Sequence, residues 1–460
     1  MRVLLVDPSE PERPNYVVIP NVGLGFLATA LRDAGHEVRI ADCRLESWSP
    51  EELPERLGDQ GYDVVGLTLF STQLRAAIRS APALRRAYPD ATFVAGGPHP
   101  SFEPEDTLRC LPEVDYAIAG EGEVPLVRLL DAGSRPDSIA GLARRVNGGA
   151  ESTPPERISE SALTALPAWD LLRPDRYPLA PNGIFSRGRR VAPVIATRGC
   201  PYSCTFCGAK KSMGAKVRKR PAARVVDEIE WLCRDFGVDE IHFMDDNFSM
   251  HAAYVREVCE DLLRRGIRIP WACPNGLRLD TLDADLLRLM ERAGCYSMAV
   301  GIESGSDATL ASIRKHLDTA TIRRQIGLIK RETRMRVTGF FIVGLPGETE
   351  ADIENTIAFS RELPLDRANF FNYSPFPGSS IYESLKESGE IEKIDPSDLY
   401  IHHVVYSPDQ LPIARLRDLQ RRAHLAFYLR PRILLGLARE IRSWFQVRVL
   451  ASRALKLLWG

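Results

Sequence analysis

Residues 191–212 read VAPVIATRGCPYSCTFCGAKKS, and this stretch decides how the rest of the chain is interpreted. Its apolar first half is a predicted buried strand, which leads directly into Cys200, Cys204 and Cys207. These three thiols are one too few for a closed structural zinc site, and an odd number cannot pair fully as disulfides. Thiolates are soft ligands that favour iron–sulfur clusters and zinc, so the loop is a candidate metal site.

A cubane iron–sulfur cluster held by only three cysteines leaves one iron with an open position. An open position binds a substrate or cofactor, so the triplet favours catalysis. Zinc, or three unrelated cysteines, remain the alternatives. The other cysteines are dispersed, and we interpret each as a buried small apolar residue: Cys43, Cys110, Cys233, Cys259, Cys273 and Cys295.

Downstream of residue 191, apolar strands alternate with amphipathic helices six times. Six βα units predict a partial (β/α)6 TIM-type barrel over residues 191–395, with its chemistry at the carboxyl ends of the strands. The cysteine loop follows the first of them. The predicted strands are 191–200, 239–248, 269–278, 296–305, 335–349 and 367–380.

Residues 1–135 show the same alternation and predict an α/β, Rossmann-like, doubly wound parallel sheet. Ligands bind to such sheets at the carboxyl ends of the strands. The predicted strands are 2–7, 36–42, 63–70, 92–100 and 114–123. The segments that follow them contain Asp7 to Asn21, then Ser71 and Thr72, then Gly96, Gly97 and His99, then Gly120 to Glu123.

Two further regions complete the predicted organisation. Residues 136–190 are interpreted as a linker with a hairpin around Asn147-Gly148-Gly149. Residues 396–460 are predicted to be helical, and eleven Lys and Arg face two acids between Arg415 and Lys456. This basic region is either a helical cap on the barrel, which we favour, or a surface for a membrane or an anionic partner.

Composition limits the class of protein. The chain has 460 residues, 44% of them hydrophobic, and a net charge of −1, so no overall field favours nucleic acid or membrane. No apolar run approaches the roughly 18 residues that a membrane span needs. The start, MRVLLVDPSE, is interpreted as a strand and not a signal peptide, which predicts a cytoplasmic protein.

The spacing CxxxCxxC of Cys200, Cys204 and Cys207, with Phe206 before the third cysteine, resembles the signature of the radical S-adenosylmethionine superfamily. The resemblance implies that the three thiolates hold a [4Fe–4S] cluster and that the methionine part of S-adenosylmethionine chelates the fourth iron. It also implies that Phe206 packs beside the adenine. Gly208 is expected to let the backbone approach the cluster closely.

Three later strand ends fit the same resemblance. HFMDDNF resembles a motif of the cobalamin-associated branch, although its polar residues also suit a helix cap. NGLR offers an amide and a guanidinium that can pair with a carboxylate, and VGIESG places an acid where relatives contact S-adenosylmethionine. The candidate cofactor-binding residues from these motifs are Asp245, Asp246, Asn247, Asn275, Arg278 and Glu303.

The N-terminal region resembles the cobalamin-binding domain that is fused to this branch, through VGLGFLATAL (22–31), GGPHP (96–100) and AGEGE (119–123). The DxHxxG motif that supplies a cobalt ligand elsewhere is absent, because Asp7 is followed by Pro8, Ser9 and Glu10. A relic domain without cobalamin is therefore the alternative. Residues expected to admit the cobalamin tail are Ser71, Thr72, Gly96 and Gly97.

The resemblance as a whole implies a cobalamin-dependent radical S-adenosylmethionine enzyme that methylates an unactivated carbon of a small-molecule or natural-product intermediate. The alternative enzyme is an oxidative cyclase or rearrangement enzyme without methyl transfer, and the alternative outside catalysis is an iron–sulfur or zinc protein. The expected partners are a small-molecule substrate and an electron donor such as flavodoxin or ferredoxin, without nucleic acid. Peripheral membrane contact through the basic C-terminus is the less favoured expectation.

Overall fold

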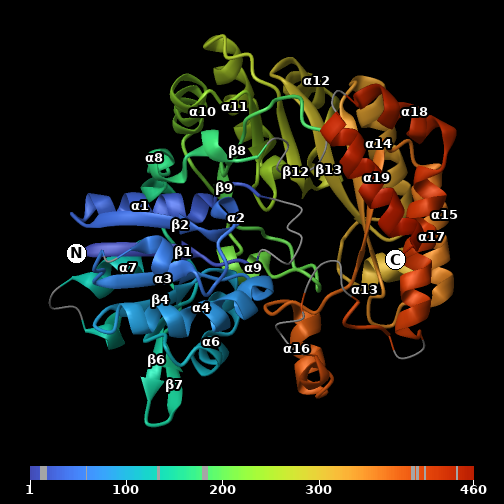
Figure 1. The fold of residues 1–460 in the computed structure, drawn as a ribbon. Coiled ribbons are helices and arrows are strands. Elements are labelled where there is room, and N and C mark those ends of the chain that lie inside the picture. Colours follow the sequence, from blue (N-terminus) through green and yellow to red (C-terminus); the bar gives the residue numbers. More distant parts are fainter. Residues whose placement is uncertain are drawn as a thin grey trace.

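The computed structural model describes residues 1–10, 18–58, 60–131, 135–178, 185–394, 399, 404–408, 411–441 and 444–459. The chain forms two α/β units that lie side by side, with the last helices packed against the second unit (Figure 1). Residues 11–17 of the first predicted loop lie outside the described residues.

The first unit is built on a seven-stranded sheet with the order β2-β1-β3-β4-β5-β6-β7. The first five strands are parallel, as predicted, and the order reverses direction between β1 and β3. Ligands bind beside such a switch point in open α/β sheets. The strands are β1 (Arg2–Asp7), β2 (Glu37–Asp42), β3 (Val64–Thr68), β4 (Thr92–Gly96), β5 (Tyr116–Ile118), β6 (Leu142–Val146) and β7 (Gly149–Ser152).

Helices cover both faces of this sheet because alternate strand residues point to opposite sides. Val3 and Leu5 pack under one pair of helices, and Leu4 and Val6 pack under the other set. The expected doubly wound fold is confirmed. One face carries α1 (Val22–Asp33) and α7 (Glu123–Leu130), and the other carries α3 (Leu53–Leu57), α4 (Leu74–Ala87) and α6 (Pro104–Cys110). The short α2 (Cys43–Glu46) and α5 (Pro98–Phe102) follow strands β2 and β4.

The predicted hairpin around Asn147 is present, but it is not part of a separate linker. Its first strand, β6, pairs antiparallel with β5, so the hairpin extends the first sheet beyond residue 135. The chain then crosses to the second unit through α8 (Trp169–Leu172). Trp169 is fully buried and donates to Glu228 Oε1 at 3.0 Å, which fixes this crossing to the barrel. We therefore propose that the first domain includes the hairpin.

The second unit is a six-stranded, all-parallel sheet with the order β15-β14-β13-β12-β11-β8, which is the expected partial barrel. The strands are β8 (Val191–Val194), β11 (Glu240–Phe243), β12 (Trp271–Leu277), β13 (Cys295–Glu303), β14 (Arg336–Val343) and β15 (Arg367–Asn372). The helices around it are α10 (Ala222–Phe236), α11 (Ala252–Arg264), α12 (Ala284–Arg292), α13 (Asp307–Ser312), α14 (Thr319–Glu332) and α15 (Glu350–Glu362).

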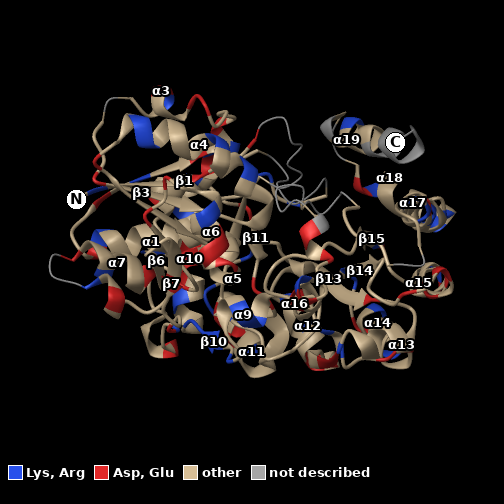
Figure 2. Ribbon diagram, turned by 90° about the horizontal axis from the view of Figure 1, so that it is seen from below, with Lys and Arg blue, Asp and Glu red and all other residues tan. Residues whose placement is uncertain are grey.

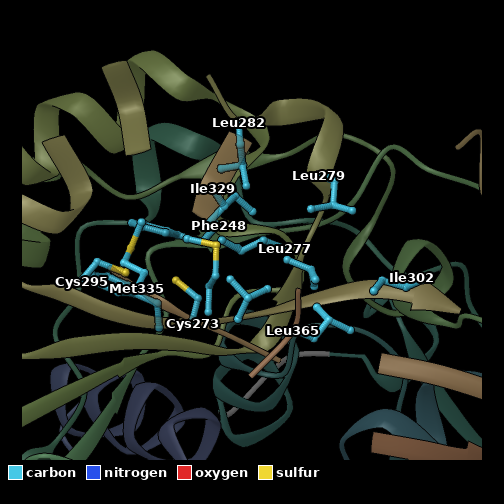
Figure 3. Packing of buried hydrophobic residues seen from close by; sticks show 14 of the residues in the cluster. Phe248, Cys273, Leu277, Leu279, Leu282, Cys295, Ile302, Ile329, Met335 and Leu365 are labelled. Carbon is cyan, nitrogen blue, oxygen red and sulfur yellow. The ribbon is translucent and has the colours of Figure 1, made fainter. Parts of the chain in front are cut away.

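The barrel core contains three of the cysteines that lie outside the loop, Cys259, Cys273 and Cys295. Cys273 and Cys295 are buried beside Met335 and Phe248, among aliphatic side chains (Figure 3). Burial raises the pKa of both thiols well above the ordinary value, so they stay neutral. They act as small apolar core residues, as the sequence suggested.

The C-terminal helices are α16 (Ser380–Glu387), α17 (Ile413–Tyr428), α18 (Pro431–Glu440) and α19 (Trp444–Trp459). Helix α17 caps the barrel by burying Leu416, Leu419 and Phe427 in the core that β15 also lines. Acidic and basic residues alternate over both units (Figure 2). Among the described residues, no helix is both long and apolar enough to cross a membrane.

Candidate active site

The cysteine loop is closed at its base by a short antiparallel clip that the sequence did not predict. Strand β9 (Thr197–Arg198) pairs with β10 (Arg218–Lys219), and Arg198 stands directly opposite Arg218. Gly199 follows with a φ of 99°, and a Cβ there would lie 2.5 Å from the Lys216 carbonyl oxygen. Only glycine fits this crossing, which starts the loop at the carboxyl end of the first barrel strands.

Backbone hydrogen bonds hold the loop against the rest of the barrel. The Cys200 amide donates to the Gly214 carbonyl at 3.1 Å, and the Cys207 amide donates to the Cys204 carbonyl at 3.1 Å. The Thr205 amide donates to Ile313, and its carbonyl accepts from Ile381. The short helix α9 (Ala209–Met213) follows the third cysteine, at the centre of the molecule in Figure 1.

All three loop cysteines are free thiols with raised pKa values. Desolvation is the main cause, and it raises the pKa of Cys207 to about 11 although this side chain is exposed to solvent. Cys207 is both accessible to solvent and surrounded by protein atoms, so it lies in a recess of the surface. Cys200 and Cys204 also raise the pKa of Cys207, so the three sulfurs are near neighbours.

The three thiols are soft donors held in one loop, which is the donor set that an iron–sulfur cluster requires. Among the residues described, no three His, Cys, Asp or Glu side chains converge closely enough to hold a single metal ion.

Arg278 packs against the cysteine loop, and three of its five N–H donors are engaged within the protein. It is buried, forms a bidentate pair with Asp280 at 2.9 and 3.0 Å, and donates to the Lys315 carbonyl. Its guanidinium carbon lies 3.6 Å from the ring centre of Tyr202, which is between the first two cysteines. This stacking is a cation–π contact that orders the loop. Nearby Asn275 is exposed and donates to the Asp245 carbonyl.

The three polar residues of the HFMDDNF motif comprise one half-buried and two buried side chains. Asp245 is buried and accepts from the backbone of Ala196 and Thr197, and desolvation raises its pKa to about 6. Asn247 is also buried and accepts from Ser249. Asp246 is only half-buried, and its charge raises the pKa of the thiols in the loop. Of the three, Asp246 is the least buried.

Glu303 ends β13 beside a lysine that the sequence analysis did not identify. Its Oε1 accepts from Lys315 Nζ at 2.7 Å, and both side chains are buried. The backbone of Glu303 has a φ of 66°, a strained conformation that places its carboxylate over Gly301. Lys315 also lowers the pKa of Cys204, so the ion pair lies next to the cysteine loop.

Phe102 brings the first unit into direct contact with the cysteine loop. This residue ends α5, just after the GGPHP motif. A Cβ on Gly208 would lie 2.8 Å from its ring, and a Cβ on Gly378 would lie 2.3 Å from it. The absence of a side chain on Gly208 therefore leaves room for the ring of Phe102. The sequence did not indicate this contact. Phe206 is half-buried and packs against the barrel core.

The carboxyl edge of the first sheet contains a polar pair and an open backbone. Ser71 is buried with its Oγ 3.0 Å from Nδ1 of His99, whose Nε2 is buried without a hydrogen-bond partner. A Cβ on Gly96 would meet no atom within 4 Å, whereas a Cβ on Gly97 (φ 103°) would lie 2.9 Å from the Leu69 carbonyl oxygen. Thr72 is half-buried in the next turn.

The position of the missing histidine motif also has an unsatisfied polar atom. Asp7 is fully buried and binds Asn21 at 2.9 Å and Arg44 at 2.9 Å. Ser9, which stands where the motif would have histidine, has a buried Oγ without a hydrogen-bond partner. A buried polar atom without a partner can be satisfied by a water molecule, an ion or a bound ligand. Ser9 and His99 therefore make this edge suitable for a large polar cofactor such as cobalamin.

A buried ion-pair cluster joins the AGEGE motif to the base of the cysteine loop. Glu121 Oε1 lies 2.7 Å from Arg198 Nη1, and Oε2 lies 2.6 Å from Arg218 Nη1. All three side chains are at least nine-tenths buried. Burial favours a higher pKa for Glu121, but the two guanidinium groups outweigh it and lower the pKa. Phe26 of α1 lies 4.8 Å below Arg198.

The sequence identified the strand ends but not the residues that join them. Nothing in the pattern distinguishes Lys315 or Tyr202 from ordinary loop residues. Lys315 reaches Glu303 because Arg314 and His316 on either side have φ values of 51° and 53°. The repeated acids of AGEGE were the one available signal for the ion-pair cluster.

This arrangement defines a class of protein in which the ligand edge of a parallel sheet faces a cysteine loop on a partial barrel. Residues 16–130 match the B12 binding domain family, and residues 194–360 match the radical SAM superfamily. The chain belongs to the cobalamin-binding-domain-containing radical S-adenosylmethionine enzymes. The cofactors of this class are a [4Fe–4S] cluster, S-adenosylmethionine and cobalamin.

Relatives and a solved structure agree with this assignment. The chain is 29% identical to an uncharacterized methyltransferase of Pyrococcus horikoshii, covering 95% of this chain and 94% of the relative. It is 28% identical to the anaerobic magnesium-protoporphyrin IX monomethyl ester cyclase of Cereibacter sphaeroides, covering 94% and 71%. The fold is that of the methyltransferase TsrM from Kitasatospora setae with cobalamin and a [4Fe–4S] cluster bound (TM-score 0.69, 20% identity, 93% and 85% covered).

Proposed function

We propose that this enzyme transfers a methyl group to an unactivated carbon of a small-molecule or natural-product intermediate. The observation that carries the proposal is the contact of Phe102 with Gly208. It brings the segment after the GGPHP motif against the residue that follows the third cysteine. A substrate held at this junction has the cobalamin edge on one side and the cysteine loop on the other, as methyl transfer to a substrate radical requires.

When bound, the cluster and S-adenosylmethionine supply the radical, and cobalamin supplies the methyl group. The protein provides position. Cys200, Cys204 and Cys207 are the proposed cluster ligands, and the clip below them fixes their loop. Arg278 orders the loop through Tyr202, so its role is structural support rather than carboxylate binding.

Glu303 is the proposed contact to S-adenosylmethionine. One of its carboxylate oxygens is held by Lys315, and the other forms no hydrogen bond within the described part of the chain. A carboxylate fixed in this way can accept from a ribose hydroxyl or an ammonium group. Asp246 is the proposed second polar contact, whereas Asp245 and Asn247 position the backbone around it.

The first experiment tests the cysteine assignment. Anaerobic reconstitution of the full chain should load about four iron atoms, and dithionite with S-adenosylmethionine should then give 5′-deoxyadenosine. Cys204→Ala should lose the iron and the 5′-deoxyadenosine. Cys233→Ala is the matched control, because this half-buried cysteine lies on α10, outside the loop. Equal cleavage by Cys204→Ala and the control would refute the site.

The second experiment separates methyl transfer from the alternative reaction. S-adenosylmethionine labelled in its methyl group is incubated with cobalamin-loaded enzyme and candidate substrates. Label in the product supports methyl transfer. Product that has lost hydrogen and gained no label supports the oxidative cyclase or rearrangement alternative, which the relationship to the magnesium-protoporphyrin ester cyclase keeps open.

The enzyme also needs an electron, for which we propose a small donor such as flavodoxin or ferredoxin. No cysteine of the described residues forms a disulfide, which suits a reducing compartment, and we propose a cytoplasmic location. Pull-down of the donor from an anaerobic extract, followed by its replacement of dithionite in the cleavage assay, tests the first proposal.

A further inference from the structure

Helix α18 presents an apolar face to solvent instead of to the protein. Residues 431, 434, 435 and 438 share one side of the helix by their spacing, and all are exposed. Leu434 and Leu435 are 46% and 52% exposed. The one buried residue of the helix, Ile433, attaches it to the barrel core. Pro431, Leu434, Leu435 and Ala438 together form the α18 face.

Further exposed apolar residues flank the helix in sequence. Leu429, just before α18, is 63% exposed, and Ile441 and Trp444, after it, are 36% and 81% exposed. Large apolar patches on a protein surface mark interaction sites. A tryptophan at the margin of such a patch suits a boundary between water and an apolar phase.

The charges that border the α18 face are basic. Arg430, Arg432 and Arg439 flank it, and the acid of this helix, Glu440, is turned inward to Arg336 at 2.6 Å and to Arg367. Burial, and then the charges of Arg432 and Arg361, lower the pKa of Arg430. The border therefore carries an excess of positive charge that the fold does not neutralise.

Arg439 also lines a cavity of about 210 Å³ at the amino ends of β13 and β14. Arg187, Arg334 and Arg336 line the same cavity. In the described part of the chain, Arg187, Arg334 and Arg439 form no ion pair, and the two acids of the lining are engaged with Lys330, Arg336 and Arg367. The cavity is large enough for a phosphate group and has the charge to hold one.

We propose that the α18 face and this arginine cavity dock the enzyme on an anionic phospholipid surface. The leucines and the tryptophan would contact the apolar part of the membrane, and the arginines would contact its anionic headgroups. The phosphate of one headgroup would bind in the cavity. The helix lies on the surface and does not span it, since it has only ten residues. Figure 2 places α17, α18 and α19 together at the end of the molecule away from the first unit.

Two other occupants suit the surface less well. A second copy of the chain, docked symmetrically, would bring two arginine borders together, and like charges across an interface disfavour it. An acidic protein would neutralise the arginines, but a single convex helix offers no groove for a partner's side chains. The proposal goes beyond the methyl transfer proposed above, and its test does not depend on catalysis.

The test is flotation of the full-length reconstituted enzyme with two kinds of vesicle, pure phosphatidylcholine and phosphatidylcholine with 30 mol% phosphatidylglycerol. We expect binding to the anionic vesicles that weakens with salt, because each basic residue near an anionic surface strengthens binding by about fivefold. Trp444 should shift its fluorescence to shorter wavelength on binding.

Two variants and two matched controls separate the contributions. Leu434→Glu with Leu435→Glu should weaken binding at least tenfold, and Arg439→Glu should weaken it about tenfold or more. The controls make the same types of substitution elsewhere: Leu263→Glu, a single change at an exposed leucine on α11, and Arg86→Glu, at an exposed arginine on α4. Both controls should bind as the parent does, and unchanged melting temperatures should show that all four variants fold.

The proposal is overturned by equal or absent binding to both vesicles, or by variants that bind like their controls. It is also overturned if the parent enzyme is a dimer, the double leucine variant is a monomer, and neither binds to vesicles. The α18 face would then be covered by a second copy of the chain. Capture of an acidic protein in place of vesicles would overturn it in the same way.

Discussion

The ion pairs of Glu121 predict that one carboxylate from the first unit keeps the cysteine loop closed. Arg198 and Arg218 stand opposite each other across the β9–β10 clip, and Glu121 lies between their guanidinium groups at 2.7 and 2.6 Å. Like charges directly opposite in a strand pair repel each other. Glu121→Gln keeps the size of the side chain and removes the charge that compensates this repulsion.

The free-energy cost of Glu121→Gln depends on the partners that Arg198 and Arg218 retain in the variant. Removing one partner of a buried ion pair costs about 3–5 kcal/mol. Arg198 retains Glu123 at 2.8 Å, and Arg218 retains the carbonyls of Ile158 and Met213 at 2.6 and 2.8 Å. The lower end, about 3 kcal/mol, is therefore expected for opening of the clip, which corresponds to about a hundredfold in the opening equilibrium.

Hydrogen exchange measured by mass spectrometry is the direct assay, because it reports local opening separately from global unfolding. Peptides that cover β9 and β10 should exchange about a hundredfold faster in Glu121→Gln, while β13 and β14 in the barrel should be unchanged. Glu123→Gln is the matched control, because Glu123 contacts one arginine of the clip and is more exposed. Equal exchange in parent and Glu121→Gln, or equal acceleration by both variants, would refute the reasoning.

Three further predictions concern single residues. Gly97→Ala should lower the free energy of unfolding by about 2–4 kcal/mol, because its Cβ would clash with the Leu69 backbone at a φ of 103°. Gly96→Ala is the control and should not lower it. Equal melting temperatures for the two variants would contradict this prediction. Arg278→Lys should lower the free energy of unfolding by about 1–2 kcal/mol and reduce iron loading, since lysine cannot both form the bidentate pair and stack on Tyr202. An unchanged iron content would contradict this role of Arg278. Burial raises the pKa of Glu348 from an ordinary 4.5 to about 7, so its stabilising contribution is full below about pH 4.5 and is lost as the pH rises through 7. The free-energy difference between Glu348→Gln and the parent should change by about 2.5 kcal/mol between pH 5 and pH 8 in urea titrations, and a constant difference would count against the assignment.

The fold could be predicted because burial patterns are local. Strands such as 2–7 and 191–194 are continuous apolar runs, and their alternation with amphipathic helices specifies parallel sheets in both units. The hairpin was predicted but placed in a linker, because hydrogen bonding between β6 and β5 joins residues far apart in sequence. No local pattern indicates which sheet a hairpin joins.

The candidate site was predictable in part for the same reason. The spacing of three cysteines is local, whereas the role of a polar residue depends on its neighbours in space. Asp245 and Arg278 have the right chemistry for a ligand, but backbone amides and Asp280 already occupy their polar groups. Lys315 and Phe102 meet the site only through the folded chain, so no sequence signal preceded them.

The order of Glu121 and the cysteines along the chain affects how the protein is made on the ribosome. The carboxylate at position 121 is synthesised well before the arginines at 198 and 218, and N-terminal domains generally fold first during synthesis. The emerging cysteine segment therefore meets a partner that has already folded. Arg198 and Arg218 can pair with Glu121 before the later barrel strands have left the exit tunnel. The cysteine loop can therefore be ordered, and able to accept iron, before synthesis of the barrel is complete.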